Sequence, residues 1–321
     1  MKKILRLIFS LVGVVFLIEI SCGCSAAAVN NIGSTSVYKI GILTPAVEHG
    51  WVAAVPYYAE QRCKELNNQV EYKLFTAADS AEMASQLDEL MAWGCDAIVA
   101  FPQWKGLEEP LQAVINQGVV VVNCDIQMNV NGIYSVIGDN NGMGSQSAQY
   151  IVDKIGKKGN VVLMDVSTED SATEERKNAF VERMTKIAPD MNRIDCETTL
   201  TREAAQQDFT ELLATYTKID AVYSMDDETS IGVLQAIKKA KRTDIKVVTG
   251  GGGSQEYFEL MSKNKKIWLQ SALYSPSMAK DAVDTAVSVL KGQKIAPSRI
   301  IATSIVDRNN YEKYLDEDSP Y

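Results

Sequence analysis

The chain is short of the residues on which metal and nucleotide chemistry depend. Its 321 residues include a single histidine, His49, and no two cysteines spaced as CxxC, so the sequence offers no ligand set for a transition metal. Neither GxxxxGK followed by Ser or Thr nor the nucleophile pattern GxSxG occurs. Acidic residues outnumber basic ones by 41 to 32, and the net charge of −9 argues against nucleic acid and anionic headgroups as partners.

No apolar run is long enough to span a bilayer, which takes about 20 residues. The longest run, residues 7–18, follows Lys2, Lys3 and Arg6 and precedes a short stretch of small residues. A basic start, a short apolar run and small residues together form an export signal. The alternative is a buried N-terminal helix, which the basic start disfavours.

The end of this signal resembles the lipobox of bacterial lipoproteins, in which a cysteine becomes the acylated first residue of the mature protein. Cys24 fits better than Cys22, because Glu19 would stand three residues before Cys22, where an apolar residue is expected. We predict a lipoprotein signal peptide over residues 1–23 and a lipidated Cys24 with a tether over residues 24–36. The mature protein would then work outside the cytoplasm, anchored by lipid to the cell membrane.

The rest of the chain is rich enough in apolar residues, 46% of the sequence, to build one large domain or two of ordinary size. Each of the four cysteines outside the signal lies in or beside an apolar pattern. We interpret them as small buried hydrophobic residues, although an exported protein permits disulfides. These cysteines are Cys63, Cys95, Cys124 and Cys196.

Short β-rich runs alternate with helical patterns from Tyr38 onward. Alternating units of this kind imply parallel sheets with right-handed crossovers. The predicted strands cover residues 38–43, 70–75, 97–100, 119–123, 160–164, 193–196, 221–224, 246–249 and 300–306, and a further strand follows Trp268. The predicted helices cover residues 81–93, 106–117, 173–187, 203–216, 228–239 and 278–290, and a further helix starts near Ser254. A helical face over residues 52–66 starts or bends at Pro56.

Two such series meet near residues 137–141, which predicts an α/β fold with two doubly wound parallel-sheet lobes. The N-terminal lobe would comprise residues 37–138 plus 274–298, and the C-terminal lobe residues 139–273 plus 299–321. The chain after Trp268 passes back and forth between them and would make a multi-strand hinge.

Ligands of open parallel sheets bind beyond the carboxyl ends of the strands. The residues expected there are rich in carboxylates, amides and indoles, which pair with the hydroxyls of a neutral polyol and stack on its C–H faces. Trp51 and Trp104 are the candidate stacking platforms, and ordinary packing between helix and sheet is the alternative for each.

Two other patterns could indicate a metal site, a glycosidase or a phosphate site. Asp226, Asp227 and Glu228 could hold a metal or act as the acid and base of a glycosidase, but adjacent residues at a strand end point in different directions. We therefore expect one ligand contact and one acid favoured by a helix dipole. The glycines at 250–253 could cradle a phosphate, yet close backbone approach or a tight turn is the simpler interpretation.

In order and spacing, several motifs resemble the type I periplasmic sugar-binding proteins, the ribose- and galactose-binding group that feeds ABC transporters. The resemblance covers residues 38–306. Its marks are Glu48-His49-Gly50-Trp51, the stretch 119–125, Ile137-Gly138-Asp139-Asn140, the stretch 171–180 and the stretch 221–232.

The resemblance implies ligand contacts for residues at matching positions. The family's first-loop ligands fall on Glu48 and Trp51, its strand-end aspartate on Asp125, its forked arginine on Arg176 and the asparagine before its acidic pair on Asp226. Four further candidates complete the predicted set. They are His49, Gln103, Trp104 and Tyr274.

Three departures from the family pattern bear on the ligand. Ile126 follows Asp125 where many members have arginine, Gly250–Gly253 replace a segment with a ligand aspartate, and Tyr274 lies near the position of a late glutamine. These departures predict a ligand other than ribose, such as a differently decorated sugar, a sugar alcohol or a less polar small molecule.

The function implied by the resemblance is a monomeric solute-binding protein that delivers its ligand to an ABC transporter permease. The alternative is a sensing subunit that presents its ligand to a membrane sensor kinase or chemoreceptor. We expect no covalent chemistry and no cofactor.

Overall fold

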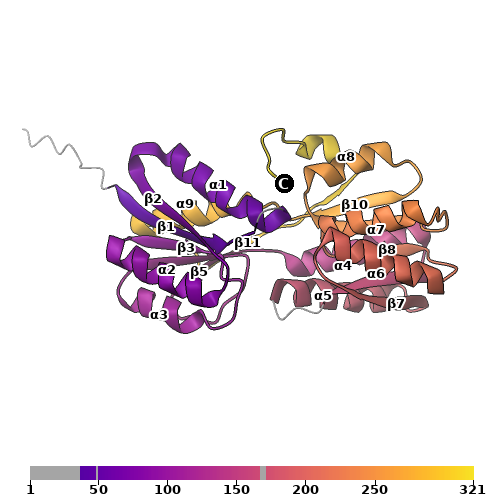
Figure 1. Cartoon of the computed structure of the whole chain (residues 1–321), viewed down its shortest axis with the longest axis horizontal. Coiled ribbons are helices and arrows are strands. Elements are labelled where there is room, and N and C mark those ends of the chain that lie inside the picture. The colour runs from indigo at the N-terminus through magenta and orange to yellow at the C-terminus, as the bar shows by residue number, and fades with distance from the viewer. Residues whose placement is uncertain (1–36, 48–49, 167–170) are drawn as a thin grey trace, which may run out of the picture. The chain divides into compact units, whose positions relative to one another are not determined.

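The computed structural model describes residues 37–47, 50–166 and 171–321. The predicted signal peptide, Cys24 and the tether to residue 36 lie outside these ranges, as do Glu48 and His49. The described residues form two sheets with helices on both faces of each (Figure 1). The predicted α/β fold with two parallel-sheet lobes is therefore confirmed.

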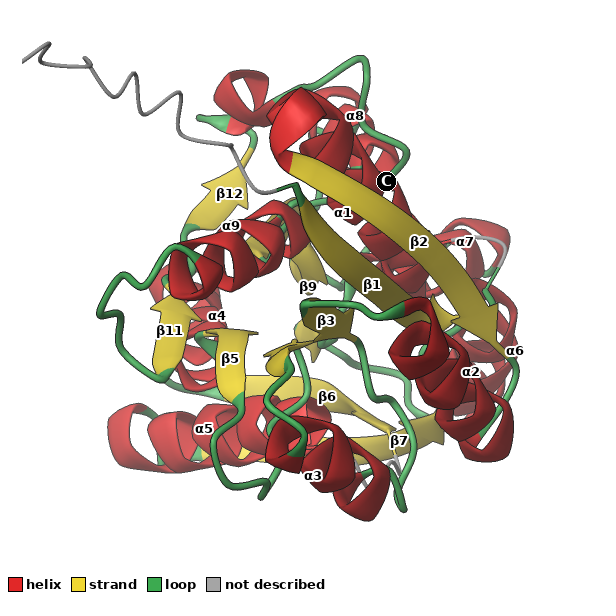
Figure 2. Cartoon of the chain, turned by 90° about the vertical axis from the view of Figure 1, so that its left-hand side faces the viewer, coloured by secondary structure: helices red, strands yellow, loops and turns green. Residues whose placement is uncertain are grey.

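The first sheet is parallel throughout and has the strand order β11-β5-β4-β3-β1-β2. Its strands are β1 (Tyr38–Pro45), β2 (Val70–Ala77), β3 (Ala97–Ala100), β4 (Val120–Cys124), β5 (Tyr134–Gly138) and β11 (Ser298–Ile301). Helices α1 (Gly50–Leu66) and α9 (Met278–Leu290) cover one face, and α2 (Ser80–Trp93) and α3 (Glu108–Asn116) cover the other (Figure 2).

The second sheet has the order β12-β10-β9-β8-β6-β7 and is parallel except for β12, which runs antiparallel to β10. Its strands are β6 (Gly159–Val166), β7 (Met191–Thr198), β8 (Ala221–Tyr223), β9 (Val247–Gly252), β10 (Trp268–Leu273) and β12 (Ile305–Asp307). One face carries α4 (Asn140–Ile155) and α5 (Ser171–Ile187), and the other carries α6 (Arg202–Thr215), α7 (Asp227–Lys239) and α8 (Gln255–Lys263).

Each sheet separates two apolar cores, and the strand alternation assigns side chains to them. In β6, Val162 and Met164 face the core under α6, α7 and α8, whereas Val161 and Leu163 face the core under α4 and α5. Residues 120–122 of β4 are all valine, which suits a central strand covered on both faces, as the sequence predicts. All four residues of β3 are buried for the same reason.

The chain crosses between the sheets three times among the described residues: after β5, after β10 and after β11. The last crossing corrects two predictions. Because β11 pairs with β5 and β12 with β10, the single strand predicted over residues 300–306 is two strands in different sheets. For the same reason, residues 299–301 belong with the N-terminal lobe rather than with the C-terminal one.

One helix is absent from the prediction, and another starts slightly before its predicted face. Helix α4 does not appear among the predicted helices, because Gly142, Gly144 and several polar residues in its first two turns weaken the helical pattern. Helix α1 begins at Gly50 and contains the predicted helical face over residues 52–66, so the helix does not start at Pro56, which lies inside it. The bounds of the other predicted helices agree with the structure to within a few residues at each end.

The four cysteines are unpaired and buried, as the sequence predicts: Cys63, Cys95, Cys124 and Cys196. Burial raises the pKa of the Cys63 thiol to about 12, so it stays protonated at neutral pH. None of the helices in the described part of the chain has the length and apolar content needed to cross a bilayer.

Candidate functional site

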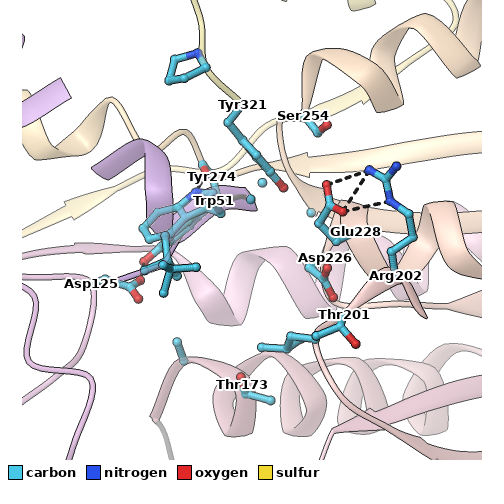
Figure 3. A pocket seen from close by; sticks show the side chains of 18 of the residues that line it. Trp51, Asp125, Thr173, Thr201, Arg202, Asp226, Glu228, Ser254, Tyr274 and Tyr321 are labelled. Carbon is cyan, nitrogen blue, oxygen red and sulfur yellow. Dashed lines mark hydrogen bonds and ion pairs between the residues drawn. The ribbon is translucent and has the colours of Figure 1, made fainter. Parts of the chain in front are cut away.

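A cavity of about 850 Å³ lies at the carboxyl ends of strands from both sheets, where ligands of open α/β sheets bind. Its volume is within the usual range of small-molecule sites, about 300–1,000 Å³. Figure 3 shows the side chains that converge on it. The residues that line the cavity include Trp51, Phe101, Gln103, Asp125, Thr173, Arg176, Thr201, Arg202, Asp226, Glu228, Gly252, Ser254, Tyr274 and Tyr321.

Tyr274 organises the aromatic side of the cavity. It directly follows β10, at the second crossing, and its hydroxyl donates a hydrogen bond to the Asp125 carboxylate. The Trp51 indole donates to the Tyr274 carbonyl at 2.5 Å, and the two rings lie 5.2 Å apart. Burial, together with the Asp125 carboxylate, raises the pKa of the Tyr274 phenol well above its usual value, so the phenol remains a donor. Both aromatic rings are thus fixed by hydrogen bonds.

The position of the Tyr274 side chain depends on Gly138 at the end of β5. The Gly138 amide donates to the Tyr274 hydroxyl at 3.2 Å. A methyl group at position 138 would lie 1.5 Å from the tyrosine Cε2, so no larger residue fits there. A glycine at the first crossing therefore allows a residue of the second crossing to reach Asp125.

Arg176 enters the cavity from α5. Its Nε donates to Asn140 Oδ1 at 2.8 Å, and its guanidinium carbon lies 4.8 Å from the centre of the Tyr274 ring. The guanidinium is thus held between α4 and the aromatic side, where its remaining N–H groups can serve a ligand. Asn140 of α4 therefore positions this arginine.

Asp226 is the N-cap residue of α7. Its Oδ1 accepts from the Thr229 amide at 2.9 Å, while Oδ2 is buried without a hydrogen-bond partner of good geometry within the described residues. Burial raises the pKa of this carboxyl group, with Thr229 opposing the rise. A buried acceptor without a partner is costly, and a ligand hydroxyl would satisfy it.

The two residues after Asp226 point elsewhere, as the sequence predicts. Asp227 is fully buried, and its Oδ2 accepts from the amides of Gly253 and Ser254 at 2.9 and 2.8 Å. Glu228 turns to the rim instead, where it pairs with Arg202 at 3.0 Å. The three carboxylates therefore do not converge. Within the described ranges, no group of three His, Cys, Asp or Glu side chains is placed to hold a metal ion.

The amides at Gly253 and Ser254 are the ones that a phosphate at the glycine run would need. Both are bonded to Asp227, and the hydroxyl of Ser254 accepts from the amide of Tyr257 as the N-cap of α8. The glycine run thus serves close backbone approach, which is the simpler of the two sequence interpretations.

Arg202 links three helices at the rim of the cavity. Its guanidinium lies 3.0 Å from Glu228 of α7 and 2.8 Å from Glu256 of α8. Burial raises the pKa of Glu228, and Arg202 opposes that rise. This ion-pair network sets the outer wall on the side of the second sheet (Figure 3).

The structure brings six of the predicted site residues to the cavity: Trp51, Gln103, Asp125, Arg176, Asp226 and Tyr274. Trp104 does not line it. Its side chain packs on the core between the first sheet, α2 and α3, which is the packing alternative for this residue. Glu48 and His49 lie outside the described residues.

Sequence reasoning missed several residues of the wall. Arg202 and Thr201 sit at the start of α6, beyond the carboxyl end of β7, and the helix-start signal of Thr201 could have found them. Tyr321 lies far from any strand end in sequence, and no pattern in the sequence points to it.

Two α/β lobes with a polar and aromatic cavity at their strand ends define a class of ligand-binding proteins that enclose a small molecule between lobes. The chain belongs to the family of periplasmic binding proteins: the family described as "Periplasmic binding protein domain" matches residues 40–294.

Named relatives are similar in sequence, and a solved structure shares the fold. The ribose import binding protein RbsB of Bacillus subtilis is 24% identical over 275 residues, covering 83% of this chain and 86% of the relative. The xylitol-binding protein of Mycolicibacterium smegmatis is 23% identical, covering 73% of this chain and 67% of the relative. A galactofuranose-binding protein superposes with a TM-score of 0.79 at 22% identity, covering 88% of this chain and all of that structure.

Proposed function

We propose that this protein captures a sugar or sugar-like polyol between its two lobes outside the cytoplasm and delivers it to the permease of an ABC transporter. The observation that carries the proposal is the cavity itself, where an indole, a guanidinium and two carboxylates from both lobes face one space. The import role is preferred to the sensing role because RbsB is named an import binding protein.

The cavity chemistry fits a neutral polyhydroxylated ligand. Arg176 offers N–H donors, while Asp125 and Asp226 offer acceptors for hydroxyl groups. Trp51 offers an apolar face on which the C–H groups of a sugar ring can pack. A ligand of net negative charge would meet the carboxylates of Asp125 and Asp226, while the Arg202 guanidinium is already paired with Glu228 and Glu256, so an anionic ligand is disfavoured.

A ligand that contacts both lobes can change how the lobes are arranged. Trp51 and Asp125 belong to the first lobe, and Arg176 and Asp226 to the second. A ligand that touches both sets favours the arrangement in which they are close, which is differential affinity acting on a two-state equilibrium. The permease would then recognise the liganded arrangement, and the ligand would leave unchanged.

Membrane attachment through Cys24 is part of the proposal. The basic start, the short apolar run and the small residues before Cys24 support it. Replacing Cys24 with alanine should abolish incorporation of labelled palmitate in a bacterial host, whereas Cys63→Ala should leave it intact. Labelling that persists in Cys24→Ala would contradict attachment at this residue.

The ligand class is tested by titration calorimetry with D-ribose, D-allose, xylitol and myo-inositol, followed by recovery of the ligand. We expect at least one of these compounds to bind and to be recovered chemically intact. Binding should also raise the unfolding temperature, because a ligand that binds only the folded state stabilises it. A chemically altered ligand, or no binding by any of the four, would sink the proposal.

A further inference from the structure

The last residues of the chain cross the cavity between the lobes. We call residues 316–321 the strap. At its start it is held by the second lobe, since Gln255 of α8 accepts from the Asp316 amide at 2.9 Å. It is then held by α1 of the first lobe, since Tyr57 donates to the Asp318 carbonyl at 3.2 Å and Tyr58 to Ser319 Oγ at 2.9 Å.

Beyond α1 the strap turns back and places Tyr321 in the cavity. Ser319 fixes this turn, because its hydroxyl donates to the Tyr321 carbonyl at 2.9 Å and accepts from the Tyr321 amide at 3.3 Å. The Tyr321 side chain is buried and projects between Tyr274 on one side and Glu228 on the other (Figure 3). The ring therefore occupies space between the two walls.

The second sheet leaves room for this ring at Gly252. A methyl group at position 252 would lie 2.6 Å from the Tyr321 hydroxyl oxygen, closer than any real contact. Gly252 also has a φ of +123°, which other residues rarely adopt. One glycine of the run at the end of β9 is thus matched to a tyrosine about 70 residues later in the chain.

The surroundings keep the phenol neutral. Burial and the carboxylates of Asp227, Asp226 and Glu228 raise the pKa of Tyr321 well above its usual value, and Arg176 opposes the rise only in part. Tyr321 lines the cavity, and a neutral phenol there can donate a hydrogen bond to a ligand oxygen.

We propose that Tyr321 is a specificity-determining residue: it walls off the cavity at Gly252, limits the ligand to a single sugar ring and donates a hydrogen bond to it. The inference rests on the proposed sugar-binding function. Because the strap is tied to α8 and α1, the tyrosine is presented to the ligand by both lobes together. Larger ligands such as disaccharides would collide with the ring.

The test compares Tyr321→Ala and Tyr321→Phe with the wild type by titration calorimetry. The probes are D-ribose, D-allose and myo-inositol as single rings, and maltose and trehalose as disaccharides. Tyr216→Ala is the matched control, because Tyr216 is exposed and lies outside the cavity.

We expect Tyr321→Ala to bind the preferred single ring about tenfold or more weakly and to gain measurable disaccharide binding. Tyr321→Phe should still reject disaccharides and lose only about threefold to tenfold for the single ring, since it keeps the wall and loses one hydrogen bond. Tyr216→Ala should match the wild type. A Tyr321→Ala variant with an unchanged affinity profile overturns the proposal.

A second measurement tests this inference separately from the sugar-binding proposal. It also remains informative if the alanine variant folds poorly. p-Cresol, the free side chain of tyrosine, should raise the unfolding temperature of Tyr321→Ala and leave the wild type and Tyr216→Ala unmoved, because a small aromatic can fill a matching cavity. If no sugar binds the wild type but p-cresol raises the unfolding temperature of Tyr321→Ala, the sugar proposal fails, whereas the inference that Tyr321 fills the space at Gly252 is supported. If p-cresol has no effect on the variant, the wall at Gly252 is refuted.

Discussion

The two sides of the cavity are built from different chemistry. The side formed with the first lobe is aromatic, and its polar groups bond to one another: Trp51 to the Tyr274 carbonyl and the Tyr274 hydroxyl to Asp125. The side formed by the second lobe is charged. Its Arg202 is shared between Glu228 and Glu256, while Asp226 keeps a buried oxygen without a partner of good geometry.

This difference assigns different tasks to the two sides. Rings held by their own hydrogen bonds form a stacking surface that needs little ordering when a ligand arrives. A buried carboxylate oxygen without a partner selects for a hydroxyl at one place, because a ligand lacking that group leaves the acceptor unsatisfied. Affinity for a ring should thus come mainly from the first lobe, and discrimination among rings from the second.

The largest effect is expected from Tyr274, on which the aromatic side depends. Tyr274→Ala should lower the free energy of unfolding by about 3–5 kcal/mol, the usual cost of removing a large buried aromatic side chain. It should also abolish ligand binding, since Trp51 and Asp125 both lose their partner. Urea denaturation and calorimetry measure the two effects.

Tyr274→Phe is the control for that change. It keeps the ring and the carbonyl but leaves the Asp125 carboxylate and the Gly138 amide without the hydroxyl, at a cost of about 1–3 kcal/mol. If the two variants lose the same stability, the hydrogen bonds matter more than the ring, and the aromatic side would not be the rigid surface described above.

Arg176 tests whether a cation of the second lobe contacts the ligand. Arg176→Ala should weaken binding by about 1.5–3 kcal/mol, the range for a hydrogen bond to a charged group. Arg183→Ala on the same helix is the matched control, because Arg183 bonds to Gln149 and lies outside the cavity. Equal calorimetric affinity for the wild type and Arg176→Ala would remove this residue from the site.

Asp227 should give the charged side a pH dependence. Burial raises the pKa of its carboxyl group from 3.8 to about 7 in the folded protein. Between these values the folded state holds one proton more than the unfolded state, so stability is greatest below about pH 4 and falls as the pH rises towards 7. The slope from this group approaches about 1.4 kcal/mol per pH unit.

The measurement is the free energy of unfolding from pH 4 to pH 8 for the wild type and Asp227→Asn. The asparagine oxygen can still accept from the amides of Gly253 and Ser254, and it does not titrate. The difference between the two proteins should therefore change across this window and level off above pH 7. A constant difference would show that Asp227 titrates at its ordinary pKa.

The aromatic side and the strand-end carboxylates are the parts of the site that the sequence predicts well. Trp51, Asp125 and Asp226 follow strands of clear apolar pattern, and the strand-end rule alone directs attention to them. Trp104 follows a strand too, but a residue near a strand end can turn either to the cavity or back to the core. Only packing decides between these, and Trp104 joins the core under α2 and α3.

The parts that the sequence does not predict depend on contacts between distant segments. The two short strands within residues 298–307 divide between sheets because their pairing partners, β5 and β10, lie in different lobes. Tyr321 reaches the cavity only because α1 and α8 hold the strap. Neither arrangement leaves a local periodicity or turn signal in the sequence.

The smallest effect is expected at the rim of the charged side. Glu256 is largely exposed, so its ion pair with Arg202 should contribute about 0.2–1 kcal/mol to stability and should weaken with added salt. Glu256→Gln should therefore lower the free energy of unfolding slightly at low ionic strength and not at about 1 M salt. Glu259→Gln, which breaks an exposed pair with Lys263 on the same helix, is the control.

The same two variants test whether the ion pairs of Arg202 order the charged side for the ligand. If they do, calorimetry should show that Glu256→Gln binds the ligand more weakly than Glu259→Gln. Equal affinities would show that Asp226 and the residues deeper in the cavity, rather than the rim, discriminate among sugar rings.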